Sequence, residues 1–583
     1  MKRLLVYLKD YKKESVLAPL FKLLEAFFEL MVPLVMANII DKGILHKDHP
    51  YILKMGLCLV ALALIGLVAA ITAQFFAARA AVGFATKLRT ALFGHIQDLN
   101  FTNIDKAGSA TMITRMTSDI NQVQNGVNMV LRLFLRSPII VFGAMIMAFT
   151  IDVESALVFV IAIPVLAIVV FGIMVWTIPY YKKVQGRLDK VLGITRENLT
   201  GVRVIRAFHR EAEEQEQFEE ENQTLATLQK FVGKISACMN PVTYIIVNGA
   251  AMALIYLGAI KVNIGALSQG EVVAILNYMS QILVELVKLA SLIITITKAL
   301  ACADRVSAVF EIQNRESASV GTDAQMQVKT SPQSDAEPYL VFDHVSLTYE
   351  GASEKTLENI HFTVNKGDTI GIIGGTGSGK SSLVNLLPAF YPVTEGSIRL
   401  EGKDLKAYSE DELRDRIGVV PQKAVLFKGT IKSNLLWGKQ NATEEEMWQA
   451  IEIAQAKEIV EGKDGKLEAS VSQNGKNLSG GQRQRLTIAR ALIRKPEILI
   501  LDDSASALDY ATDAKLRKAL KTLEESTTTF IVSQRPSSIS HADKIIVLDD
   551  GEVAGIGTHE ELLASCEVYQ EIYYSQYDKE SAE

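Results

Sequence analysis

Six long apolar stretches in the first 300 residues of this 583-residue chain limit what it can fold into. A helix needs about 20 residues to cross the hydrocarbon core of a bilayer, and each stretch is long enough. They lie near residues 16–40, 52–81, 129–151, 154–180, 238–260 and 271–300. The mean hydropathy of +0.19 averages these spans with a more polar remainder. We expect a six-helix transmembrane domain over 1–312, a polar linker over 313–337 and a soluble α/β domain over 338–583.

Basic residues predict the orientation of the spans. The first fifteen residues carry Lys2, Arg3, Lys9, Lys12 and Lys13, and the connection 181–237 carries ten more Lys and Arg residues. Cytoplasmic loops are enriched in Lys and Arg. We therefore expect a multi-pass membrane protein with both termini and the soluble domain on the cytoplasmic side. The outer loops are then the short connections Asp41–Tyr51, Asp152–Glu154 and Lys261–Gly270.

The start of the chain is basic but lacks the apolar core and cleavage site of a secretory signal. Residues 2–14 are predicted to lie along the membrane surface before the first span. The long inner connections, about 82–128 and 181–237, have helical periodicity and are expected to extend the membrane helices into the cytoplasm as paired rods. The second includes an acidic helix, Glu211–Glu221, with a solvated face that could also contact the soluble domain.

Ionisable residues occur inside two spans. Lys22, Glu25 and Glu29 lie in the first, and Glu285 and Lys288 in the sixth. Charges at membrane depth are costly and usually face a bundle interior or a wet cavity. Glu285 and Lys288 share a helical face, so they either neutralise each other or line a substrate path.

Charge and cysteine content exclude two classes of function. The net charge is −6 and no basic stripe with interleaved aromatic residues is present, so no nucleic-acid partner is expected. The cysteines have no metal-binding or pairing pattern and are interpreted as buried small apolar residues. They are Cys58, Cys238, Cys302 and Cys566.

A glycine-rich loop lies between a predicted strand, 369–373, and a predicted helix, Ser381–Leu387. This context is the one that a phosphate-binding P-loop requires. Backbone N–H groups of the loop and the helix N-terminus favour bound phosphate. Lys380 is expected to reach the β- and γ-phosphates, and the Ser381 hydroxyl to ligate Mg²⁺. The loop consists of Gly374, Gly375, Thr376, Gly377, Ser378, Gly379, Lys380 and Ser381.

Two later segments extend this pattern. Residues 498–502 form an apolar strand that ends in Asp502, which a buried parallel sheet would deliver to Mg²⁺. About 120 residues separate the P-loop from this strand, and they leave room for a helical subdomain. Leu478–Gln482 begins a strongly helical segment with small residues and a hydroxyl, a second candidate phosphate-binding helix start.

Taken with these motifs, the chain resembles a half-transporter of the ATP-binding cassette (ABC) exporter superfamily. It is similar to the degenerate-site chain of bacterial heterodimeric multidrug exporters. The resemblance rests on the P-loop, Gln422 after Val420-Pro421, the Leu-Ser-Gly-Gly-Gln signature at 478–482, residues 498–503, Ser506–Asp509, Tyr349 and the passage 197–208. It implies ATP and Mg²⁺ as ligands, with adenine stacked on Tyr349. It further assigns ATP contacts to Ser382, Ser479, Gly480, Gly481, Gln482 and Asp509, and Mg²⁺ contacts to Ser381, Gln422 and Asp502.

The family also implies a partner. Two such chains pair head-to-tail around two ATP molecules, and each ATP contacts the P-loop of one chain and the signature of the other. Closure of this sandwich switches the membrane helices from inward to outward access, driven by the differential affinity of the closed state for ATP.

Four positions depart from the family pattern. Asp503 stands where a catalytic Glu is usual, Gln534 where a switch His is usual, and Ser504-Ala505 where Pro-Thr is usual. Asp is one methylene shorter than Glu, and a misplacement of about 1 Å can cost on the order of a hundredfold in rate. Gln carries no positive charge and cannot shuttle a proton. The signature is intact, so we expect a slow ATP site in this chain and a fast one completed for a second half-transporter.

The predicted function is ATP-driven efflux of amphipathic small molecules. A homodimer with two slow sites, a lipid or peptide exporter, and an ATP-gated regulatory membrane protein remain as alternatives. Peptide exporters often carry an additional N-terminal peptidase domain, and none is visible in this sequence.

Overall fold

The computed structural model describes residues 3–313, 338–523 and 527–577. Apart from Gln313, the predicted linker 313–337 lies outside these residues, and the boundaries at 312 and 337 stay predictions. The chain forms two compact units. The first comprises Met1–Asp98 and Ala107–Gln313, and the second comprises Leu99–Lys106 and Asn314–Glu583.

The first unit contains six long apolar helices, each enclosing one predicted span. They cover Leu4–Ile44, His49–Gln97, Ser109–Ile151, Val153–Thr200, Glu211–Asn263 and Gln269–Phe310. Each has 41 to 53 residues, roughly twice what a bilayer requires. At about 1.5 Å per residue such helices are about 60–80 Å long. The chain is therefore a multi-pass membrane protein whose helices extend beyond the membrane as rods.

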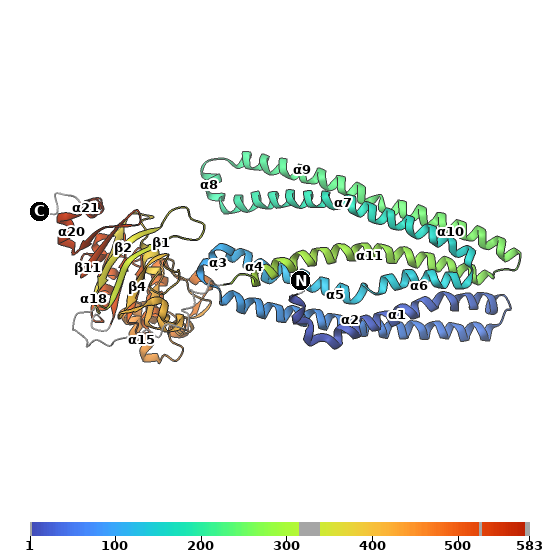
Figure 1. Ribbon diagram of the computed structural model, residues 1–583, viewed down its shortest axis with the longest axis horizontal. Helices are drawn as coiled ribbons and strands as arrows, with labels where there is room; N and C mark the ends of the chain where they lie inside the picture. The colour runs from blue at the N-terminus through green and yellow to red at the C-terminus, as the bar shows by residue number, and fades with distance from the viewer. Residues whose placement is uncertain (1–2, 314–337, 524–526, 578–583) are drawn as a thin grey trace. The chain divides into compact units, whose positions relative to one another are not determined.

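Several of these helices are built from shorter elements that follow one another directly (Figure 1). The first elements in chain order are η1 (Leu4–Tyr11), α1 (Lys12–Asn38), η2 (Ile39–Ile44), α2 (His49–Gln97), α3 (Phe101–Ala107), α4 (Ser109–Thr114) and η3 (Arg115–Asp119). The others are α5 (Ile120–Leu133), α6 (Arg136–Ile151), α7 (Val153–Thr200), α8 (Val202–Ala207), α9 (Glu211–Ala237), α10 (Met239–Asn263) and α11 (Gln269–Phe310).

Small residues allow close packing of α1 against α2. Ala69, Ala73, Ala77 and Ala80 are spaced at helical intervals on α2 and are buried, whereas apolar side chains such as Val68 are exposed. Small residues let membrane helices approach closely. The exposed apolar face is the one that lipid would cover. Helix α11 packs against α1, α5 and α6.

Helices α7 and α9 form a hairpin with the short helix α8 at its tip (Figure 1). The segment 181–237 is thus a pair of helical rods, as predicted. Leu199, Val204 and Phe208 near the tip are 74%, 60% and 74% exposed. Large apolar side chains at this exposure are unpartnered within the single chain.

A buried ion cluster joins three membrane helices. The guanidinium of Arg136 on α6 lies 2.6 Å from Glu285 on α11 and 2.6 Å from Glu29 on α1. Arg136 is 6% exposed and Glu285 only 2%. Lys288 also pairs with Glu285, at 2.8 Å. The pairing of Glu285 with Lys288, one of the two predicted alternatives, is therefore present, but the buried partner of Glu285 is Arg136, which was not among the predicted charged residues of the spans.

The cysteines fit their interpretation in part. Cys302 and Cys566 are buried and Cys58 is half-buried, but Cys238 is exposed, so the prediction of burial was wrong for Cys238. Cys238 precedes α10 at a helix junction, where the single chain leaves it uncovered.

The second unit is organised around a six-stranded sheet with strand order β12-β11-β3-β10-β9-β6. All neighbouring pairs are parallel except β11 with β12. The central strands are apolar because a parallel sheet is buried on both faces. Their bounds are β3 (Thr369–Gly374), β6 (Ile417–Val420), β9 (Ile498–Asp502), β10 (Thr528–Val532), β11 (Lys544–Asp549) and β12 (Glu552–Gly557).

An antiparallel sheet with order β2-β1-β4-β5 shares an apolar core with one face of this sheet. Its strands are β1 (Leu340–Leu347), β2 (Leu357–Val364), β4 (Glu395–Leu400) and β5 (Lys403–Asp404); β7 (Gly429–Thr430) and β8 (Ser470–Val471) pair separately. The helices are α12 (Lys380–Asn385), α13 (Glu410–Arg416), α14 (Ile431–Leu435), α15 (Glu444–Ile453), α16 (Lys457–Glu461), α17 (Gly480–Leu492), α18 (Tyr510–Lys521), α19 (Pro536–Ile539), α20 (His559–Ser565) and α21 (Glu567–Tyr574). Helices α14 to α17 form the helical region predicted between the P-loop and the strand that ends in Asp502.

Candidate nucleotide-binding site

The glycine-rich loop connects β3 to α12, as its sequence predicts. Gly377 and Gly379 both have φ of 90°, a conformation that L side chains rarely adopt. A Cβ at Gly374 would lie 2.1 Å from the Leu548 carbonyl oxygen, so only glycine fits where β3 meets β11. The loop therefore exposes backbone rather than side chains above the N-terminus of α12.

Lys380, the first residue of α12, folds into this loop. Its ammonium donates hydrogen bonds to the Gly374 carbonyl at 2.9 Å and to the Ser378 hydroxyl at 3.3 Å. Burial lowers the pKa of Lys380, and the carboxylates of Asp503 and Asp502 oppose that shift. A buried cation beside the N-terminus of α12 favours an anion such as phosphate.

Ser381 and Asp502 come together from α12 and the end of β9. The Ser381 hydroxyl donates a hydrogen bond to Asp502 Oδ1 at 2.9 Å. Asp502 is 7% exposed, and burial raises its pKa. A hydroxyl and a carboxylate are oxygen ligands of the type that Mg²⁺ prefers, and a cation would offset the desolvation of the carboxylate. These two residues fit the predicted magnesium site.

Asp503 and Gln534 reach the same edge of the sheet because β9 and β10 are parallel neighbours, with Val532 opposite Asp502. Asp503 has φ of 46°, and its N–H donates to the Val532 carbonyl at 3.0 Å. Gln422 donates from its side-chain amide to Asp503 Oδ2 at 3.4 Å. The side chain of Gln534 is exposed. Three of the predicted reacting-centre residues thus lie where parallel strands end.

Tyr349, in the loop between β1 and β2, is tied to α12. Its hydroxyl donates to the Ser382 hydroxyl at 3.0 Å. Its ring meets the Tyr391 ring edge-on, with centroids 4.9 Å apart and an interplanar angle of 89°. The predicted adenine-stacking residue is therefore held beside the P-loop helix by two contacts.

Tyr391 and its link to α3 were not among the predicted site residues. The Tyr391 hydroxyl donates to the Asp105 carboxylate at 2.7 Å, and Phe101 packs on Phe390 with ring centroids 4.5 Å apart. Residues 99–106 belong to the second compact unit, although they lie in the sequence between two membrane helices. The sequence signal was an aromatic residue and a carboxylate in a polar connection, which is too weak to show that residues 99–106 belong to the second unit.

The signature segment caps a different helix. Ser479 is the N-cap of α17, and its hydroxyl accepts from the Gln482 N–H, while Gln482 Oε1 accepts from the Ser479 N–H. A Cβ at Gly481 would lie 3.0 Å from the Ala507 carbonyl oxygen, so the segment 506–509 lies against it. A hydrogen bond from Thr512 lowers the pKa of Asp509. The second unit thus presents two candidate phosphate-binding helix starts, α12 and α17.

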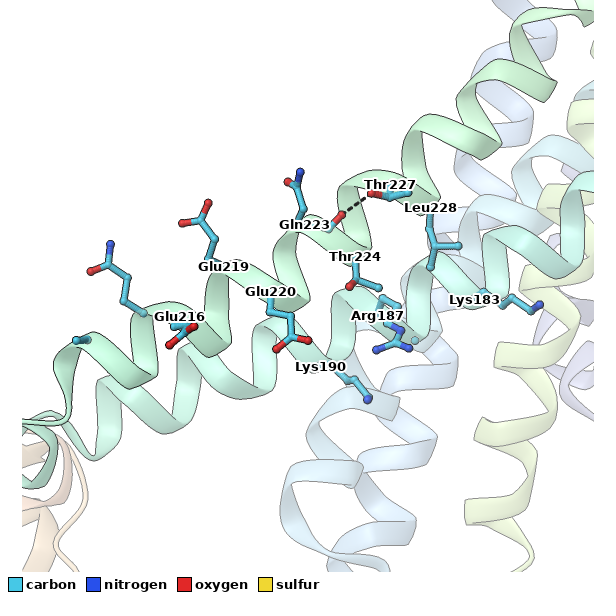
Figure 2. Close-up of a pocket in the computed structure, with 13 residues that line it drawn as sticks. Lys183, Arg187, Lys190, Glu216, Glu219, Glu220, Gln223, Thr224, Thr227 and Leu228 are labelled. Atoms are coloured by element: carbon cyan, nitrogen blue, oxygen red, sulfur yellow. Dashed lines mark hydrogen bonds between the residues drawn. The ribbon is translucent and has the colours of Figure 1, made fainter.

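A large open cavity lies elsewhere, along the α7–α9 hairpin (Figure 2). Its volume is about 1340 Å³, and it is lined on α7 by basic residues and on α9 by acidic ones. The charged residues that line the cavity are Lys183, Arg187, Lys190, Glu216, Glu219 and Glu220. Arg187 also pairs with Glu221 across the hairpin at 2.9 Å. The acidic face of α9 is thus partly neutralised by its own hairpin.

Comparisons with known proteins agree with this architecture. Residues 15–286 match the family model described as the ABC transporter transmembrane region, and residues 357–506 match the model described as ABC transporter. The chain is 35% identical over 585 residues to the uncharacterized ABC transporter ATP-binding protein YfiB of Bacillus subtilis, covering 100% of both chains. It is 34% identical to the probable multidrug resistance ABC transporter ATP-binding/permease protein YheI of the same organism, over 84% of this chain and 82% of that one.

Two more distant relatives extend the comparison. The ATP-dependent lipid A-core flippase of Desulfotalea psychrophila is 31% identical over 92% of each chain. The solved structure of a bacterial Atm1-family ABC exporter with ATP bound superposes with a TM-score of 0.78, at 23% identity, over 98% of this chain and 99% of that one. At this identity the likeness concerns the fold.

A membrane domain of six long helices joined to a P-loop nucleotide domain defines the class of ATP-coupled membrane transporters. The chain belongs to the ABC transporter family and has the exporter architecture of fused transmembrane and ATP-binding domains. It is therefore a multi-pass membrane protein that binds ATP and couples it to transport.

Proposed function

We propose that this chain is one half of a heterodimeric exporter in which its own P-loop holds ATP at a slow site. Its signature segment completes a fast site on the P-loop of a second half-transporter. The observation that carries the proposal is the combination of Asp503 and Gln534 at the reacting edge with an unaltered signature at α17.

The residues of this site divide into binding and reacting groups. Lys380 and the loop N–H groups bind and orient the β- and γ-phosphates, and Tyr349 stacks on adenine. Ser381, Asp502 and Gln422 are proposed to hold Mg²⁺, which when bound neutralises phosphate charge. The P-loop side of the ATP site is therefore complete in this chain, and the partner's signature would supply the other side.

The reacting groups are incomplete. A Glu at position 503 would orient the attacking water, but the Asp503 carboxylate is one methylene shorter and hydrogen bonds to Gln422 at 3.4 Å. Its backbone is in the left-handed region, which Asp adopts more readily than most residues. Gln534 offers a neutral amide where a cationic or proton-carrying group is expected. ATP is thus retained at this site longer than it is at the partner's.

The hairpin surfaces support a two-chain assembly. Leu199, Val204 and Phe208 expose apolar surface at the hairpin tip, where an interface with a second chain would bury them. We propose that this tip contacts the nucleotide domain of the partner. Closure of the two nucleotide domains around ATP would then move the membrane helices through the hairpins, exposing the transport path to the outside.

The proposed cargo is an amphipathic small molecule, exported across the bacterial cytoplasmic membrane with both termini inside. The relative named as a probable multidrug resistance transporter supports this cargo. The relative named as a lipid A-core flippase supports a lipid cargo as the second candidate. An ATP-gated regulatory protein is the third.

The test is co-expression of this chain with an adjacently encoded half-transporter, followed by reconstitution into sealed vesicles. We expect the pair, and neither chain alone, to transport an amphipathic dye when ATP is added. Dye transport without ATP turnover, or no transport of either a dye or a fluorescent lipid, would contradict the exporter assignment. Full transport by this chain alone would contradict the heterodimer.

A further inference from the structure

A β-bulge on the edge of the antiparallel sheet brings three metal-binding side chains together. Phe342 pairs with Phe362 and Val345 with Ile360, so Asp343 and His344 on β1 both lie opposite His361 on β2. His344 has φ of 50° within this bulge. A bulge of this kind re-aims side chains that would otherwise alternate between the two faces of a strand. It allows adjacent residues 343 and 344 to meet the same cross-strand partner.

The three ligand atoms are already close. One carboxylate oxygen of Asp343 and one ring nitrogen each of His344 and His361 lie within 4.8 Å of one another. The two imidazole rings are stacked, with centroids 4.9 Å apart and an interplanar angle of 21°. A tetrahedral Zn²⁺ at about 2.0–2.1 Å from each ligand would hold the ligand atoms about 3.4 Å apart. Both histidines are exposed, so small rotations of their side chains suffice.

Neighbouring residues orient these ligands. His344 Nδ1 lies 2.6 Å from Asn359 Oδ1. Because the amide oxygen only accepts, the hydrogen bond requires the proton of His344 to be on Nδ1, leaving Nε2 free to coordinate. Histidine ligands in metal sites are commonly oriented by such a hydrogen bond on the other ring nitrogen.

Arg399 on β4 fixes the carboxylate. Its guanidinium lies 2.6 Å from Asp343 Oδ2, while Asp343 Oδ1 lies 3.9 Å from His361 Nδ1. The oxygen that faces the histidines is therefore the one not bound to Arg399. Arg399 also neutralises the charge of Asp343, so electrostatic attraction between Asp343 and a cation is weak. The two imidazoles must therefore supply most of the affinity for a metal ion.

We propose that Asp343, His344 and His361 bind one divalent transition-metal ion of the Zn²⁺ class. Imidazole nitrogens suit Zn²⁺, Cu²⁺ and Ni²⁺, whereas Mg²⁺ prefers oxygen ligands. The site is thus chemically distinct from the candidate magnesium site at Ser381 and Asp502. The ion bridges β1 to β2, the two strands that flank the Tyr349 loop, and it leaves a fourth coordination position open. This inference does not depend on the proposed transport function.

The test uses the full-length chain, purified in detergent without a histidine tag and with Mg²⁺ in excess to occupy oxygen-only sites. Cu²⁺ serves as the probe, because its electron paramagnetic resonance spectrum reports the number of coordinated imidazole nitrogens. We expect one Cu²⁺ per chain with two imidazole nitrogens, displaced by Zn²⁺. His361→Gln should weaken binding at least about tenfold and reduce the signal to one nitrogen. His541→Gln, an exposed histidine in the same unit, should behave as the wild type.

A second pair of variants separates ligation from folding. Asn359 has φ of 51°, which Gly and Asp both tolerate. Asn359→Asp keeps an acceptor for His344 and should retain the affinity, whereas Asn359→Gly removes the acceptor and should weaken binding about tenfold. Wild-type Cu²⁺ affinity and spectra in both His344→Asn and His361→Gln, or a wild-type spectrum without two imidazole nitrogens, would overturn the proposal.

Discussion

The hydroxyl of Tyr391 lies 2.7 Å from the carboxylate of Asp105, a residue of the polar connection between two membrane helices. Burial raises the pKa of Tyr391, and the hydrogen bond to Asp105 raises it further, so the phenol remains a donor at neutral pH. The Tyr391 ring also contacts the Tyr349 ring, and the Tyr349 hydroxyl bonds to Ser382 at the P-loop helix. A continuous set of contacts thus links α3 to the candidate adenine position.

We expect Tyr391→Phe and Asp105→Asn to be coupled. Tyr391→Phe keeps the ring contact with Tyr349 and removes only the hydrogen bond, which to a charged acceptor contributes roughly 1.5–3 kcal/mol. A double-mutant cycle on thermal unfolding should give an interaction free energy of at least about 0.5 kcal/mol. Tyr408→Phe, which loses a hydrogen bond to the backbone carbonyl of Leu400 and not to α3, is the matched control with Asp105→Asn. Additive effects of Tyr391→Phe and Asp105→Asn would show that the contact is not formed.

The buried ion cluster gives a second prediction. Arg136→Met should destabilise the membrane unit by roughly 3–5 kcal/mol, because it leaves the buried carboxylate of Glu285 without its closest arginine partner. Replacing both residues, as Arg136→Met with Glu285→Leu, should recover much of the loss. Lys288 is 44% exposed at its side chain, so Lys288→Met should cost far less.

The measurement is the thermal unfolding midpoint of the purified chain in nanodiscs. If Arg136→Met and Lys288→Met lower this midpoint equally, the cluster is not organised around Arg136. If the double variant is less stable than Arg136→Met alone, Glu285 has a stabilising role beyond its pairing with Arg136.

Much of this fold could be predicted from local sequence patterns. The six spans were found because a run of about twenty consecutive apolar residues is rarely anything but a membrane helix. The P-loop and the strand ending in Asp502 were placed correctly because strand, glycine-rich turn and helix follow one another directly in sequence. In each case the signal and the structure it predicts occupy the same short segment.

The residues that were missed depend on tertiary contacts. Arg136 lies 149 positions from Glu285, and Asp105 lies 286 positions from Tyr391. No periodicity connects such pairs, because their partners are set by how helices and sheets pack. The cluster of Asp343, His344 and His361 was missed for a similar reason. The bulge that brings His344 to His361 shifts the pairing of β1 with β2 by one residue, and no local sequence pattern predicts that shift.

The proposed asymmetry predicts unequal effects of two substitutions in the co-expressed pair. Asp503→Ala should lower ATP hydrolysis only modestly, because Asp503 belongs to the slow site. Ser479→Arg should nearly abolish it, since a bulky cation at the start of α17 blocks the signature that serves the partner's ATP. Phosphate release by the reconstituted pair measures both. Equal losses from Asp503→Ala and Ser479→Arg would refute the division into slow and fast sites.

The same reasoning predicts a gain of activity in the chain expressed alone. Two copies of this chain would pair intact P-loops with intact signatures, so the slow step should depend on positions 503 and 534. Asp503→Glu with Gln534→His should raise ATP hydrolysis at least about tenfold over the isolated wild-type chain. A positioned base typically contributes roughly 10²–10⁴-fold to the rate. The left-handed backbone at position 503, which Glu adopts less readily than Asp, offsets part of this gain. Addition of Ser479→Arg to this double variant should remove the gain, because hydrolysis across two copies needs the signature.

The gain should also require self-association, measured by crosslinking through the exposed Cys238. Rapid hydrolysis by the unmodified isolated chain would contradict the proposal, and a self-associated double variant with no gain would show that groups other than Asp503 and Gln534 limit the rate.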